Sequence, residues 1–266
     1  MSLKITILGC GSSAGVPRVA QGWGACDPQN SRNRRRRCSI LVEQLGPQGV
    51  TQVLIDTSPD VREQLLDVGL TRLDAILLTH PHADHIHGID DVRPIVAHMG
   101  EMIDVHMDAP TSAVMKQAFG YIFETQPGSV YPPLLREKRL TPGIACRVDV
   151  QGGALEAIPF RLNHGEIDAL GFRFGAMAYT PDVKSIPPES EPFLKKLDLW
   201  IIDSLRVTPH PTHISLPEAL GLIDFFKPRR AILTNLSNEL DYETMRGALP
   251  AHIRPAHDGL IVELDI

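Results

Sequence analysis

The chain has 266 residues, of which 43% are hydrophobic, and a formal net charge of -6 at pH 7. This length can bury a substantial core as one domain or two tightly fused halves, and we expect one domain over residues 1–266. The acidic balance argues against binding nucleic acid through the overall field, although it leaves room for local basic patches. No stretch approaches the ~18 apolar residues of a membrane span. We therefore expect a soluble, cytoplasmic protein without a secretory leader, whose four cysteines are reduced thiols.

The chain begins with a strand from Lys4 to Gly9, followed by a glycine-rich loop over residues 9–18. Its glycines permit sharp turns, and Ser12 and Ser13 offer hydroxyl groups. The loop lacks the Walker and dinucleotide-binding patterns. It can cradle an anion, with Ser12, Ser13 and Arg18 as candidate substrate-binding residues, or it can be an ordinary tight turn.

Five arginines occupy the six positions from Arg32 to Arg37. Guanidinium groups can clamp phosphate bidentately, but a basic run that is solvated or pairs with acidic surface is slightly favoured. Two paired strands, 39–45 and 51–55, follow. Asp56 comes next, either to orient a metal-binding histidine or as a loop acid. Ser58 is the expected N-cap of the next helix.

A histidine-rich segment then follows an apolar run, 75–78, that predicts a buried parallel strand. A helix from Ile86 to about His98 comes after it, so the segment lies where ligands bind in open α/β sheets. His80 and His82 can converge on one ion, and Asp84 and His85 on a second beside it. Zinc, manganese and iron accept such ligands. The alternative is a solvated histidine-rich loop.

The remaining chain alternates strands with helices, which predicts α/β layers. We expect an irregular segment over 124–143. The expected strands are 104–107, 145–150, 154–162, 170–178, 199–202, 230–233 and a last one from Leu260, and the expected helices are 110–123, 216–226 and 242–249. Single polar residues recur at strand ends and indicate one rim of the sheets: His80, His164, Asp182, Asp203 and Asn235.

The run from Thr79 to Gly88 resembles the T-H-x-H-x-D-H-x-x-G signature of the metallo-β-lactamase fold superfamily. The resemblance implies an αββα sandwich, two packed mixed sheets flanked by helices. It also implies two divalent metal ions. His80, His82 and His164 would hold the first, Asp84 and His85 the second, and Asp182 would bridge both.

Two such cations would lower the pKa of a shared water to near neutrality and supply hydroxide for attack on a phosphodiester. Asp84 and His213 are the expected catalytic residues. The segment from His213 to Ala219 resembles the His-x-Ser-Leu-x-Glu-Ala segment of the superfamily's phosphodiesterase branch, where the histidine serves proton transfer. Alternatively, His213 makes a helix-cap contact.

Three further segments resemble the phosphoribosyl 1,2-cyclic phosphate phosphodiesterase group: Gly-Ser-Ser-x-Gly-Val-Pro, Trp-Gly-Ala-Cys-Asp, and Leu-Thr-Asn-Leu-Ser-Asn-Glu-Leu-Asp-Tyr. The chain departs from that group at Asn235, where the group has a histidine on the second metal. Asn235 is instead a candidate substrate-binding residue, and the oxygen-rich second site would favour manganese, iron or magnesium over zinc, or stay partly occupied. Only Cys26 remains of the group's structural-zinc ligands, with Asn238 at the histidine position, so no structural zinc is expected.

These patterns predict a metal-dependent phosphoric diester hydrolase that acts on a small cyclic phosphate or a nucleotide-like ester. The alternatives are a tRNA 3′-processing-type ribonuclease and a non-catalytic metal- or nucleotide-binding protein. The expected partner is the small phosphate-ester substrate. Nucleic acid is less favoured, no membrane is involved, and a homodimer is compatible with the sequence.

Overall fold

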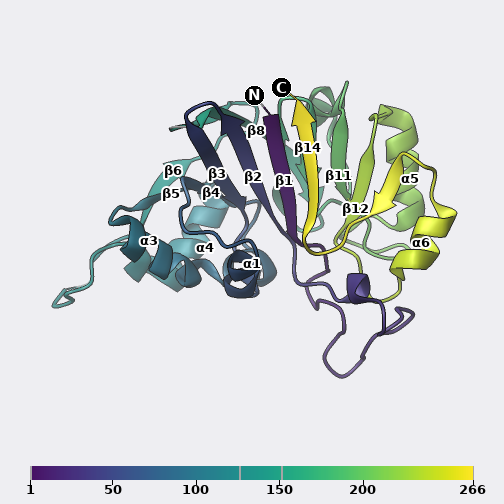
Figure 1. The fold of residues 1–266 in the computed structure, drawn as a ribbon, viewed down its shortest axis with the longest axis horizontal. Coiled ribbons are helices and arrows are strands. Elements are labelled where there is room, and N and C mark those ends of the chain that lie inside the picture. The colour runs from purple at the N-terminus through teal and green to yellow at the C-terminus, as the bar shows by residue number, and fades with distance from the viewer. Residues whose placement is uncertain (1, 126, 151, 266) are drawn as a thin grey trace.

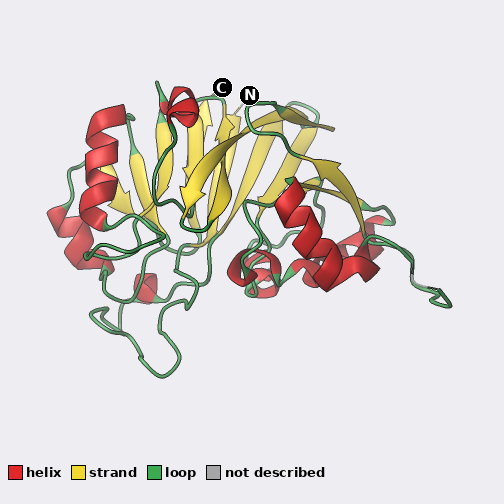
Figure 2. Cartoon of the chain, turned by 180° about the vertical axis from the view of Figure 1, so that it is seen from behind, coloured by secondary structure: helices red, strands yellow, loops and turns green. Residues whose placement is uncertain are grey.

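A computed structural model describes residues 2–125, 127–150 and 152–265. Two seven-stranded mixed sheets pack face to face, with helices on their outer faces (Figures 1 and 2). The first sheet has the order β14 (Leu260–Asp265), β1 (Ser2–Gly9), β2 (Ser39–Gly46), β3 (Gly49–Ile55), β4 (Ala75–Leu77), β5 (Ile103–Met107) and β6 (Leu135–Arg139). The second has the order β13 (Ile253–Pro255), β12 (Ala231–Thr234), β11 (Leu199–Asp203), β10 (Met177–Thr180), β9 (Ile167–Phe174), β8 (Gly153–His164) and β7 (Cys146–Val150). The predicted four-layer α/β sandwich is confirmed.

The helices on the outer face of the first sheet come from the first half of the chain, and those on the second sheet come from the last quarter. On the first sheet lie α1 (Val61–Asp67), α2 (Ala83–Ile86), α3 (Arg93–Met99) and α4 (Ala109–Phe119), and on the second lie α5 (Leu216–Phe226) and α6 (Tyr242–Ala248). Short 3-10 turns span Ser31–Asn33, Ile89–Val92, Gly120–Ile122 and Pro188–Leu194. No helix among the described residues is long and apolar enough to cross a membrane.

Both sheets are built in the same way, half antiparallel and half parallel. The parallel halves run from β3 to β6 and from β10 to β13. A core of buried aliphatic and aromatic side chains lies between the sheets, and each sheet has a second core beneath its helices. Because parallel strands end at the same edge, the polar residues that follow β4, β10, β11 and β12 gather on one side of the sandwich.

The helix predicted from Ser58 begins later. The structure starts α1 at Val61 with Asp60 as N-cap, and Ser58 Oγ accepts a hydrogen bond from Asp60 N at 3.1 Å. The backbone of Thr57 explains the delay, since its N–H donates to His85 O and its carbonyl accepts from Gly88 N. These bonds tie residues 57–58 to the histidine segment and keep them out of the helix.

Other elements also differ from the prediction. The single helix from Ile86 is three pieces, α2, a 3-10 turn and α3, and the single strand 170–178 is the hairpin β9–β10, which turns at Gly175 with φ 54°. The segment 124–143 contains the short strand β6, paired in parallel with β5, and β13 was not predicted. Such short strands at sheet edges carry too few residues for a pattern to stand out.

Candidate metal centre

The histidine segment leaves β4 and turns sharply before α2. Gly88, which follows α2, lets the end of the segment pack against residues 57–58, because its N–H donates to Thr57 O at 2.9 Å and an added Cβ would lie 2.0 Å from Ser58 O. Only glycine allows such close backbone approach. The turn before α2 and the contact of Gly88 after it thus hold His80, His82 and His85 at the same edge of the sandwich.

Four side chains converge there from three separate strand ends. His80 and His82 come from the loop after β4, His164 ends β8, and Asp182 follows β10. One ligand atom from each lies within 4.8 Å of the others. The spacings are 3.0 Å for His80 Nε2 to His82 Nδ1, 3.3 Å for His82 Nδ1 to His164 Nε2, and 3.4 Å for His164 Nε2 to Asp182 Oδ2. A tetrahedron around zinc has edges of about 3.3–3.4 Å, so these spacings suit one divalent ion.

The hydrogen bonds on the far side of each ring leave bare nitrogens facing inward. His164 Nδ1 donates to Thr212 O at 2.8 Å, which leaves its Nε2 without hydrogen. Thr79 Oγ1 donates to Asp56 Oδ2 at 2.8 Å and can therefore accept from His80 Nδ1 at 3.0 Å. Bare imidazole nitrogens that face one another repel unless a cation lies between them.

A second group lies beside the first. Asp56 Oδ2 accepts from His85 Nδ1 at 2.7 Å, so in the neutral ring, the form that binds metal, His85 Nε2 carries no hydrogen. Nε2 is buried with no hydrogen-bond partner. That nitrogen lies 3.5 Å from Asp84 Oδ2 and 3.4 Å from Asp182 Oδ1. The two oxygens of Asp182 thus face the two groups, as expected for a carboxylate that bridges two ions.

Burial and charge set the protonation states in this cluster. Burial lowers the pKa of His80 and of His164, and nearby imidazoles add to this effect, so both favour the neutral form that binds metal. Burial also acts to lower the pKa of His85, but the carboxylates around it raise that pKa well above its usual value. Burial acts to raise the pKa of Asp182, and the surrounding histidines outweigh this and hold it well below the usual range. Carboxylates crowded on one imidazole favour a cation at this place.

His213 lies at the rim of the cluster, in the loop before α5. Its Nδ1 donates to Asp203 Oδ2 at 2.9 Å, and its Nε2 lies 3.9 Å from Asp182 Oδ2. Burial acts to lower the pKa of His213, but the hydrogen bond and the charge of Asp203 raise it to about 9. The cap of α5 is made by Ser215 and Glu218, so the alternative of a helix-cap role for His213 is wrong.

Asn235 follows β12 and contacts this same group. Its Nδ2 donates to Asp182 Oδ1 at 3.0 Å and to Pro181 O at 3.2 Å. The amide thus presents its nitrogen, not its oxygen, to the cluster.

The glycine-rich loop packs against the chain rather than forming a backbone anion nest. The N–H groups of Gly11, Ser12, Gly15 and Val16 all donate to backbone carbonyls, at 2.7, 3.3, 2.7 and 2.9 Å. Ser12 lies beside Leu236, the residue after Asn235, and its buried hydroxyl has no partner. Ser13 is exposed, Arg18 is half-buried, and no hydrogen bond joins either to the cluster in the described chain.

The arginine run is largely neutralised by the protein itself. Arg36 pairs with Asp67 and Asp258, and Arg37 with Asp60. Arg35 is buried and donates to the carbonyl oxygens of Ser237 and Leu240. This is the favoured interpretation of the run, in which it pairs with acidic surface.

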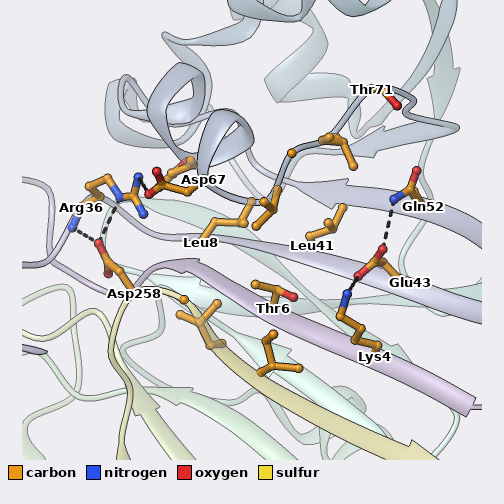
Figure 3. A pocket seen from close by; sticks show the side chains of 17 residues that line it. Lys4, Thr6, Leu8, Arg36, Leu41, Glu43, Gln52, Asp67, Thr71 and Asp258 are labelled. Carbon is orange, nitrogen blue, oxygen red and sulfur yellow. Dashed lines mark hydrogen bonds and ion pairs between the residues drawn. The ribbon is translucent and has the colours of Figure 1, made fainter.

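A well-formed pocket of about 350 Å³ lies elsewhere, on the outer face of β1 and β2 beside α1 (Figure 3). Its charged groups pair with one another, Arg36 with Asp67 and Asp258, and Lys4 with Glu43 (Figure 3). No unpaired charge among these groups is left to fix a ligand. We therefore place the functional site at the histidine cluster, where polar atoms lack partners.

The sequence did not predict the roles that two residues of the site have in the structure. Thr79 contacts both His80 and Asp56, and Asp203, which was expected only as a rim residue, holds His213. Asp203 carried a usable signal, because it is the polar residue that ends the apolar strand β11. Asp56 contacts His85, as one of its two interpretations required.

Comparison with known families and structures agrees with this geometry. The family described as "Beta-lactamase superfamily domain" matches residues 51–234. A crystal structure of a diphosphatase from the PhnP family is 37% identical, has a TM-score of 0.88, and matches 99% of this chain and 98% of that one. The zinc-bound PqqB of Methylobacterium extorquens, 18% identical with a TM-score of 0.74, covers 98% of this chain and 100% of that one and shares the fold.

Two curated relatives carry other names. A ribonuclease Z of Bradyrhizobium sp. strain ORS 278 is 30% identical, over 91% of this chain and 74% of that protein. An octanoyltransferase of Porphyromonas gingivalis strain W83 is 33% identical over 99% of this chain, but the chain spans only 52% of that protein. The family match over residues 51–234, the sandwich and the His/Asp cluster together show that the chain belongs to the β-lactamase superfamily and is a metal-dependent hydrolase of the metallo-β-lactamase fold.

Proposed function

We propose that the protein is a dinuclear metal-dependent phosphodiesterase, acting as one domain in the cytoplasm on a small cyclic phosphate or nucleotide-like phosphate ester. The observation that carries this proposal is the position of His213. Its Nε2 faces the metal-binding cluster at 3.9 Å from Asp182 Oδ2, while Asp203 fixes the other side of the ring. A histidine held in this way can deliver a proton to a leaving oxygen.

His80, His82 and His164 would hold one divalent ion, Asp84 and His85 a second, and Asp182 would bridge them. Bound there, the ions would activate water and stabilise charge on the phosphoryl group. The protein residues have separate tasks. Asp56, Thr79 and Thr212 keep the imidazoles in the ligand tautomer, and His213 holds the proton for the leaving group. Ser12 and Asn235 are the substrate-binding candidates nearest to the cluster.

The similarity to a PhnP-family diphosphatase over 99% of the chain supports a small phosphate substrate. A second candidate is a 3′-processing ribonuclease, favoured by the match to ribonuclease Z over 91% of the chain. Against RNA stand the net charge of -6 and the arginine run, since Arg36 and Arg37 are paired with carboxylates. The octanoyltransferase name does not assign acyl transfer to this chain, because the match covers only 52% of that protein.

Turnover by purified protein loaded with Mn²⁺ tests the proposal. The substrates are bis(p-nitrophenyl) phosphate, a ribose cyclic phosphate, a nucleoside diphosphate ester and a tRNA with a 3′ extension. We expect turnover of a small ester with little dependence on salt. Preferred cleavage of the tRNA, weakening steeply with ionic strength, would instead identify a ribonuclease.

His213→Ala tests the proton donor in the same assay. We expect kcat to fall by ~10²–10⁴-fold while the metal content stays unchanged, because general acid catalysis has this magnitude. Unchanged turnover would remove His213 from the mechanism. Loss of metal together with activity would make it a structural residue of the cluster.

A further inference from the structure

The two metal positions of the proposed function differ in how many protein atoms face them. The first is surrounded by three imidazole nitrogens and Asp182 Oδ2, all within 4.8 Å of one another. The second is faced by His85 Nε2, Asp84 Oδ2 and Asp182 Oδ1. It thus has one protein atom fewer, and two of its three atoms are oxygens.

Asn235 lies beside Asp182 Oδ1, next to the second position, but it cannot bind a cation through Nδ2, the atom that faces this oxygen. Its Nδ2 uses its two hydrogens on Asp182 Oδ1 and Pro181 O, and an amide nitrogen has no lone pair to give. A flipped amide would set its oxygen against these two acceptors, so the hydrogen bonds fix the orientation. Nδ2 also lies 3.2 Å from His213 Nδ1, but that nitrogen already donates to Asp203 and is no acceptor.

The hydrogen bond from Asn235 weakens only one of the two carboxylate oxygens of Asp182 as a metal ligand. Asp182 Oδ1, which faces His85, accepts the hydrogen bond from Asn235 at 3.0 Å. Asp182 Oδ2 faces His164 at 3.4 Å and His80 at 3.7 Å, on the side of the first position. A donor on Oδ1 withdraws charge from the oxygen that a second ion would need, so the two positions differ in donor strength as well as in donor number.

We infer that Asn235 makes the second metal position a weak, exchangeable site. The protein then retains one divalent ion firmly at the first position and takes the second from solution. Full activity depends on the free concentration of that ion. This inference rests on the proposed dinuclear function and adds a form of regulation to it, with Asn235 as the positioning residue that sets the difference.

Metal binding, measured without turnover, tests the inference. The chelator-treated protein is titrated with Mn²⁺ by equilibrium dialysis and electron paramagnetic resonance, which reports coupled pairs of ions. We expect two separate binding steps, with the coupled signal only in the second. Asp84→Asn removes one ligand of the second position and is expected to weaken that step alone by at least ~10-fold.

Asn235→His is the decisive variant, because it offers an imidazole where the amide stands. The backbone at Asn235 has φ 60°, a region that histidine tolerates better than most residues. We expect the second step to tighten by at least ~10-fold. Asn235→Ala is its matched control, since it removes the two hydrogen bonds, and with them the donor on Asp182 Oδ1, without adding a ligand. It is therefore expected to tighten the second step by less than Asn235→His does.

Three outcomes would overturn the inference: two equal binding steps in the natural protein, an unchanged second step in Asn235→His, or equal weakening of both steps in Asp84→Asn. Binding of no Mn²⁺ at all, or of one ion with phosphodiester turnover absent at every concentration, would contradict the proposed function itself. The two failures are therefore distinguishable.

Discussion

The histidine segment and the arginine run are both dense in charge, and the structure treats them in opposite ways. In the arginine run, Arg35 meets two carbonyl oxygens, and Arg36 and Arg37 meet carboxylates. In the histidine segment, the bare nitrogens of His80 and His85 face inward, and His85 Nε2 has no hydrogen-bond partner. The nitrogens of the histidine segment face other ligand-type atoms without hydrogen bonds between donors and acceptors, whereas most of the arginine groups are paired by the chain itself.

The physical cost explains why this contrast is informative. A buried polar group without a partner costs ~1–3 kcal/mol, so a protein keeps such groups together only where a ligand repays them. In the arginine run most of the partners belong to the chain, and Arg35 Nε is the buried atom of the run that has neither a hydrogen bond nor an ion pair among the described residues. The contrast predicts that mutations in the two regions fail differently, one in metal binding and activity, the other in stability.

Breaking the metal cluster should have the largest effect. His164→Ala removes a nitrogen that faces both His82 and Asp182. We expect the rate of hydrolysis to fall by ~10³-fold or more, since metal ions stabilise the transition state of such reactions by several kcal/mol. The protein should stay folded and lose bound metal. Asn163→Ala is the matched control, because Asn163 bonds Ser185 at 2.9 Å instead of the cluster and should keep its activity.

Removing the charge behind His213 should have a smaller effect with a characteristic pH dependence. In the proposed mechanism the protonated imidazole of His213 donates the proton, so activity is expected to fall as pH rises through its pKa, which Asp203 raises to about 9. Asp203→Asn removes that cause, and the alkaline fall in kcat should move to lower pH. A pH–kcat profile of the metal-loaded enzyme checks this, and an unmoved alkaline limb would separate Asp203 from the proton donor.

Breaking the arginine run should leave the metal site intact and lower stability. Arg35→Met removes the hydrogen bonds that Arg35 donates to the carbonyl oxygens of Ser237 and Leu240 at 3.0 and 2.7 Å. We expect a loss of ~2–4 kcal/mol in the free energy of unfolding by urea. Arg34→Met, at an exposed neighbour, should change it by less than ~0.5 kcal/mol. Metal loss in Arg35→Met with unchanged stability would reverse the assignment of the two regions.

Much of the fold could be predicted because long amphipathic and apolar segments carry their own signal. The helix 216–226 was predicted with its observed bounds, and β4 and β11 followed from their apolar runs. The hairpin at Gly175 was read as one strand, since a single glycine between two apolar stretches does not reveal whether the chain reverses. The start of α1 was missed because backbone bonds from a distant segment decide it.

The sequence by itself determined the kind of chemistry, because the histidines and the aspartate of residues 80–85 lie close along the chain and their spacing constrains what they can bind. It left the roles of Asn235, Asp203 and the arginines open, since each role depends on which atom of a distant residue lies opposite. Tertiary structure alone brought Asp182 between the histidines and turned the amide nitrogen of Asn235 toward it. Hydrogen bonds and metal coordination act over about 2–4 Å, a distance that only the folded chain can set between residues far apart in sequence.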